Sequence, residues 1–95
     1  HTAGDRSVRM ALDAIEAARR ANGDSGLRHE LAHAGYIDPA DIPRFAKLNA
    51  VADYSPILWH PSPIIAAIRT ALGDRGNQYW PTRSLIDAKA PMLAG

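Results

Sequence analysis

The sequence contains no cysteine, which excludes disulfides, thiolate zinc sites and cysteine nucleophiles. It also has no apolar run near the roughly 20 residues of a membrane span, and no basic-then-apolar leader opens it. Its charge is balanced, because 11 Lys and Arg face 10 Asp and Glu. A balanced charge supplies no basic field for nucleic acid. We therefore expect neither a nucleic acid nor a membrane as partner, and a cytoplasmic location.

What the sequence does have is apolar periodicity that changes from helical to strand-like along the chain. We expect helices at Ser7–Ala21, from Ile37 to Leu48, from Ile64 to Leu72 and at Thr82–Ala88, and strands at Leu27–Ala34, Ala50–Tyr54 and Pro91–Gly95. This alternation is typical of parallel strands joined by crossover helices, in a barrel or a doubly wound sheet. Three strands cannot close an eight-stranded barrel, and both chain ends resemble cuts, so we expect residues 1–95 to be part of a larger fold.

Local signals mark where two of these helices begin and end. Asp5 or Ser7 can cap the amides of the first helix, and Asn22-Gly23 supplies its left-handed stop. Before the second helix, Asp38 is expected as the cap, and Asp41 lies near the positive end of the helix dipole. We interpret Asp38 and Asp41 as helix-start residues and not as catalysts.

Two histidines stand where consecutive parallel strands are expected to end. His1 directly precedes the first helix, and His33 lies at the end of the first strand, before the second helix. Neighbouring strands lie about 4.8 Å apart, so two such imidazoles are within reach of one ion with metal–nitrogen distances of about 2.0–2.1 Å. Active sites of barrels and open sheets lie at this end of the strands. Against this, an N-terminal His can be a cloning remnant, and a strand-end His can simply bond to a carbonyl.

Three blocks in order resemble one enzyme family. They are His1-Thr2-Ala3-Gly4-Asp5-Arg6 with the helix after it, Arg28-His29-Glu30-Leu31-Ala32-His33 with Ile37-Asp38-Pro39-Ala40-Asp41, and Arg83-Ser84-Leu85-Ile86-Asp87-Ala88 running to Gly95. Together they resemble the amidohydrolase superfamily, and most closely the subgroup of N-substituted formamide deformylases and related metal-dependent hydrolases (amidohydrolase family 3). The chain departs from this pattern at Ala32, where relatives often carry Glu.

The resemblance implies a partial (β/α)8 TIM barrel, from the end of strand five to the start of strand eight. It implies that His1 and His33 are ligands of Zn²⁺, with one or two divalent ions bound in the complete site. In that family an aspartate after strand eight serves as ligand and general base, and the remaining ligands lie upstream. The resemblance therefore implies no catalytic residue within residues 1–95, and we expect this segment alone to be inactive.

The chemistry expected of such a site is hydrolysis of a carbon–nitrogen bond other than a peptide bond. Zinc lowers the pKa of a water molecule towards about 7 and polarises the carbonyl of an amide-like small molecule. His29 could support the ligands from the same strand face, although packing is an alternative. Asp5 could orient a ligand as well, although a helix cap is the alternative that we favour.

An aromatic loop, Ile57–Pro63, follows the second strand at the end where barrels build substrate pockets. Tyr54, Trp59 and His60 are therefore candidate substrate-binding residues, or else a lid packed on its neighbours. The competing interpretation of the whole chain is a non-catalytic α/β interaction module, in which the histidines pack or bond to backbone. A second copy of the chain is a further candidate partner.

Overall fold

The computed structural model describes residues 1–95 and contains every helix and strand that the sequence predicts, in the predicted order. The elements are α1 (Asp5–Asn22), β1 (Glu30–Ala32), η1 (Pro39–Asp41), α2 (Ile42–Lys47), β2 (Val51–Tyr54), η2 (Pro56–Leu58), α3 (Pro63–Leu72), η3 (Gly73–Asn77), α4 (Thr82–Asp87) and β3 (Met92–Ala94), where η denotes a short 3-10 helix. The strands are shorter than expected. None of the helices is both long and apolar enough to cross a membrane.

The three strands form one parallel sheet in the order β1-β2-β3. Register pairs Leu31 with Ala52, and Ala32 with Asp53, which in turn faces Leu93 of β3. Side chains alternate between the two faces of a sheet, and only Leu31, Ala52 and Tyr54 join the buried core. The helices therefore cover one face, and the row Ala32, Asp53 and Leu93 lies on the other.

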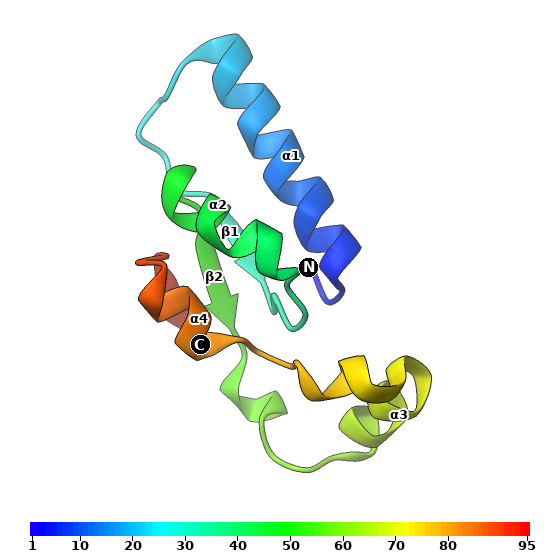
Figure 1. Ribbon diagram of the computed structural model, residues 1–95. Coiled ribbons are helices and arrows are strands. Elements are labelled where there is room, and N and C mark those ends of the chain that lie inside the picture. The colour runs from blue at the N-terminus through cyan, green and yellow to red at the C-terminus, as the bar shows by residue number, and fades with distance from the viewer.

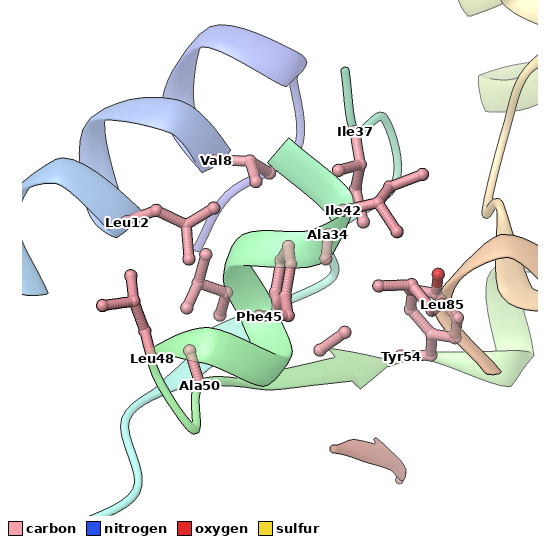
Figure 2. Packing of buried hydrophobic residues seen from close by; sticks show 12 residues of the cluster. Val8, Leu12, Ala34, Ile37, Ile42, Phe45, Leu48, Ala50, Tyr54 and Leu85 are labelled. Atoms are coloured by element: carbon pink, nitrogen blue, oxygen red, sulfur yellow. The ribbon is translucent and has the colours of Figure 1, made fainter. Parts of the chain in front are cut away.

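The core fills the space between this covered face and the helices α1, α2 and α4. Figure 2 shows side chains from all three helices gathered over β2, with Phe45 of α2 at the centre. Val8 and Leu12 come from α1, and Leu85 comes from α4. Helical periodicity in the sequence predicts the buried faces of α1, through Val8 and Leu12, and of α2, through Phe45, and both faces are confirmed, although Ala18, expected on the same stripe of α1, is exposed.

The start and end of α1 differ in how well they were predicted. Gly23 has a φ of 78° and its N–H donates to the carbonyl of Arg19, as expected of a helix stop. At the other end, Gly4 is the N-cap, and Ser7 Oγ accepts from the Gly4 amide at 3.2 Å. The expectation that Asp5 caps α1 was wrong. Asp5 is already the first helical residue, where its charge favours the helix dipole.

The two acidic residues expected at the start of the second helix, Asp38 and Asp41, have different roles. The Asp38 carboxylate accepts from the Ala40 amide at 2.9 Å, which confirms the predicted cap, and this bond lowers the Asp38 pKa. Asp41, in contrast, is buried and forms ion pairs with Arg9 Nε at 2.8 Å and Arg44 Nη1 at 3.0 Å. Its main role is to join α1 to α2, because a buried carboxylate requires a charged or hydrogen-bonding partner.

The segment from Ser55 to Pro81 extends beyond the carboxyl ends of the strands. Figure 1 shows α3 and the turns around it set apart from the sheet, at the end to which the β2 arrow points. Ser62 Oγ accepts from the Ile65 amide and caps α3, and Gly73 ends it with a φ of 58°. No residue of α3 is buried. This part of the chain thus lies at the strand ends and contributes to the core only through Trp80, which is partly buried against the core cluster.

Candidate metal centre

The two histidines singled out by the sequence lie against each other. His1 Nδ1 and His33 Nε2 are 2.7 Å apart, and the ring centroids are 4.7 Å apart. The backbone segments next to the two histidines are also joined, because the Thr2 amide and hydroxyl both donate to the Ala32 carbonyl, at 2.9 and 3.0 Å. The predicted adjacency of His1 to the carboxyl end of β1 is therefore confirmed.

The backbone turns sharply at His33. The predicted strand over Leu27–Ala34 was too long, because His33 and Ala34 have φ values of 71° and 38°, which no β-strand accommodates. Residues other than glycine hold such angles only where the surrounding structure fixes them, at a cost of about 1–3 kcal/mol each, and they cluster at functional sites. The left-handed turn is the reason that His33 leaves the strand alternation.

Two further residues hold His33 in place, and sequence reasoning missed both. Ser55 Oγ lies 3.0 Å from His33 Nδ1, the nitrogen on the far side of the ring from His1. Trp80 Nε1 donates to the His33 carbonyl at 3.1 Å. A signal for Ser55 was present, since it directly follows the second strand. Nothing in the local pattern points to Trp80, which is 47 positions away from His33.

The donor set fits a divalent cation in its chemistry and nearly in its spacing. Two nitrogens bound at about 2.0–2.1 Å with a tetrahedral angle between them lie about 3.3 Å apart. The observed 2.7 Å is the spacing of a hydrogen bond, so a small opening of the two rings would admit an ion. If Nε2 of His33 held an ion, Nδ1 would carry the proton, and Ser55 Oγ, 3.0 Å away, would accept a hydrogen bond from that N–H.

Two nitrogens do not complete a metal site. No group of three or more His, Cys, Asp or Glu side chains in residues 1–95 is arranged to hold an ion. A catalytic zinc usually has three protein ligands. The pair is accordingly a partial ligand set, and neither imidazole has a carboxylate as hydrogen-bond partner.

The two residues expected to support the pair do not contact it. His29 is exposed and precedes β1, so it lies at the opposite end of that strand from His33, roughly 13 Å along the chain. Asp5 forms an ion pair with Arg75 of η3 and accepts from the Arg6 amide. The positions of His29 and Asp5 therefore give no evidence that either residue orients the histidine pair.

The three candidate substrate-binding residues differ in how far their side chains are exposed. Tyr54 is only 1% exposed and belongs to the core cluster, so it offers no surface to a ligand. Its hydroxyl is buried without a hydrogen-bond partner, and burial raises the pKa of Tyr54 to about 12. Trp59 is 49% exposed, and His60 is also exposed. Both line a hollow of about 330 Å³ together with Tyr79 and Trp80.

The chain thus combines a parallel α/β sheet, helices on one face of that sheet and two converging imidazoles at its carboxyl edge. Comparison with protein families identifies a matching family. The model of an amidohydrolase family matches residues 1–95, which is the whole length of the chain. The chain belongs to this amidohydrolase family.

Comparison with individual proteins adds no closer relative. No curated protein and no solved structure matches the chain significantly. The family match bears out the broad resemblance to amidohydrolases, and the formamide deformylase-like subgroup stays a prediction.

Proposed function

We propose that this chain is part of the catalytic barrel of a metal-dependent amidohydrolase that cleaves carbon–nitrogen bonds other than peptide bonds in small molecules. The observation that carries the proposal is the convergence of His1 Nδ1 and His33 Nε2 to 2.7 Å at the carboxyl edge of a parallel sheet. Membership in an amidohydrolase family makes hydrolysis the class of chemistry that this edge would serve.

The sheet supports the proposed position in a (β/α)8 barrel. The strands follow one another in sequence order, all parallel, and the connecting helices α2 and α4 lie on the same face as α1. Barrels repeat this unit eight times with the helices outside. We assign β1, β2 and β3 to strands six, seven and eight, which makes His1 the end of strand five and residues 1–95 a segment of one catalytic domain.

Within such a site the chain's own residues bind and orient. His1 Nδ1 and His33 Nε2 would hold Zn²⁺ or a similar divalent ion through their lone pairs, and Ser55 would fix the His33 tautomer. When bound, such an ion supplies Lewis acidity toward a carbonyl and acidifies a water molecule. Neutral imidazoles suit this role because they leave the charge of the ion uncancelled. We assign no proton-transfer role to any of the 95 residues.

The test of this proposal is metal content. In the intact protein, His1→Ala and His33→Ala should each reduce bound zinc, measured by elemental analysis after dialysis, to the background of the chelator-treated protein. His29→Ala and His60→Ala are matched controls, because neither residue contacts the pair, and they should keep wild-type metal content. Residues 1–95 alone should show no metal-dependent hydrolysis of an amide panel.

The hydrogen-bond spacing of the two rings favours one competing function. In a non-catalytic module the imidazoles would simply bond to each other, which the 2.7 Å separation also satisfies. Unchanged zinc content in both histidine variants would refute the enzyme and support the module.

A further inference from the structure

Beside the histidine pair lies a hollow walled by aromatic rings. The ring centroids of Trp59 and Trp80 are 5.8 Å apart with planes inclined by 58°, and those of Tyr79 and Trp80 are 3.7 Å apart at 32°. The rings form an open corner that His60 and Ile65 extend, and the hollow measures about 330 Å³. That volume lies at the small end of the range for small-molecule sites, about 300–1,000 Å³.

The hollow has four polar lining residues, His60, Ser62, Arg69 and Asn77, and Arg69 is the one with a permanent charge. Arg69 of α3 lines it, is exposed, and takes part in none of the ion pairs or side-chain hydrogen bonds of the structure. Its backbone is held closely, because a Cβ added to the buried Gly76 would lie 2.8 Å from Arg69 Cα. A guanidinium fixed at its base beside aromatic walls is suited to a planar carboxylate.

The walls of the hollow are fastened to the loop that carries His33. Trp80 donates twice to that loop, from Nε1 to the His33 carbonyl at 3.1 Å and from its amide to the Gly35 carbonyl at 2.7 Å. Tyr79 stacks on Tyr36 at a centroid distance of 4.8 Å. A ligand seated in the hollow is thereby positioned at the same end of the sheet as the histidine pair.

We infer that the hollow is the specificity subsite, and that it takes the part of the substrate that carries an aromatic ring and a carboxylate. The ring would pack into the corner of Trp59 and Trp80, where inclined aromatic contacts are favourable, and the carboxylate would pair with Arg69. The inference rests on the proposed function for the reaction that follows binding. Which chemical groups bind is inferred from the hollow alone.

Binding to the metal-stripped intact protein tests the subsite without any turnover. Titration calorimetry with phenylacetate, phenylacetamide and acetate separates the ring from the charge. Phenylacetate should bind about 10-fold more tightly than phenylacetamide, because only the ionised acid can form a bidentate ion pair with the guanidinium, and acetate should bind more weakly than either. Arg69→Gln should abolish the preference for the acid, and Trp59→Ala should weaken both aromatic ligands about 10-fold.

Arg83→Gln is the matched control, because Arg83 is exposed and pairs only with Asp87 in α4. It should leave all three affinities unchanged, and Arg69→Lys should keep part of the acid preference. Equal binding of acid and amide, or no effect of Arg69→Gln, would overturn the subsite. Because the metal has been removed, neither result affects the zinc measurement on the two histidine variants. A failure of that zinc measurement would likewise not affect the ligand-binding result.

Discussion

The chain contains two regions built on different principles: the sheet with α1, α2 and α4, and the segment from Ser55 to Pro81. Every buried hydrophobic side chain lies in the first region, and Gly76 is the sole buried residue of the second. Large hydrophobic residues are exposed in both regions, namely Ile57, Trp59 and Ile64 in the second and Met10, Ile86 and Leu93 in the first. Figure 1 shows the same division, with α3 apart from the packed body.

The difference shows which interactions fix the positions of side chains in each region. In the body, close packing around Phe45 and the Asp41 ion pairs set the separation of β1 from α1, and so the approach of His33 to His1. In the segment, position comes from a few directional contacts, chiefly the Trp80 hydrogen bonds and the Tyr79–Tyr36 stack. The first arrangement fixes the two imidazoles relative to each other, and the second leaves the side chain of Trp59 half exposed.

The largest expected effect is on stability, and it tests whether the core lies in the first region alone. Phe45→Ala should reduce the free energy of unfolding by about 3–5 kcal/mol, since Phe45 is fully buried and leaves a cavity. Ile64→Ala, in the exposed face of α3, should change it by less than about 0.5 kcal/mol. Urea unfolding followed by circular dichroism measures both. Comparable losses would mean that α3 is part of the core.

The second prediction concerns Ser55, at the junction of the two regions. Ser55→Ala should weaken zinc binding about 10- to 100-fold, because it removes the oxygen that accepts from His33 Nδ1. Competition with a chromogenic chelator measures the affinity. Ser55→Thr should restore it, and Ser62→Ala, which removes only the cap of α3, should leave it unchanged. An effect confined to protein stability would contradict a positioning role.

The contact between the regions can be tested at Gly35. A Cβ there would lie 2.6 Å from Tyr79 Cε2, so Gly35→Ala should displace the Tyr79 ring. Because a side chain and not the backbone must shift, the loss of stability should be only about 1 kcal/mol. The near-ultraviolet circular dichroism of the aromatic rings should change, while Gly95→Ala, which meets nothing within 4 Å, should alter neither signal.

The smallest effect belongs to the body and appears only in acid. Arg44 and Lys47 hydrogen-bond to Glu16 and lower its pKa from 4.5. Glu16 thus contributes stability above about pH 4.5, and this contribution is lost as pH falls through its lowered folded pKa. In Glu16→Gln the urea midpoint should fall less steeply below pH 4.5 than in the wild type. Glu30→Gln, which removes an exposed carboxylate without an ion pair, should retain the wild-type slope.

Sequence alone predicted the body better than the segment, and the reason is physical. Helix and strand periods report which side chains face a core, so α1, α2, β2 and the approach of His1 to His33 followed from local pattern and strand spacing. The burial of Tyr54 was predictable but was missed, because Tyr54 ends β2 and strand alternation places it on the same face as Ala52. The Asp41–Arg9 ion pair also escaped local pattern, since Arg9 is 32 positions away.

Of the site, only the approach of His1 to His33 was predicted. Ser55 and Trp80 act on His33 across 22 and 47 positions; the place of Ser55 directly after the second strand was a signal, whereas nothing local points to Trp80. The left-handed φ of His33 was also missed, because histidine is enriched at such angles but adopts them at few positions. These angles arise when tertiary contacts override the preference of the residue.

The strand order has a consequence for how the molecule assembles. Each strand lies beside the one made just before it, β2 on β1 and β3 on β2. A chain that leaves the ribosome at about 5–20 residues per second can therefore extend its sheet at one growing edge, with no later segment inserted between earlier ones. The histidine pair would meet once His33 has emerged, tens of residues ahead of the aromatic rings of Trp59 and Trp80.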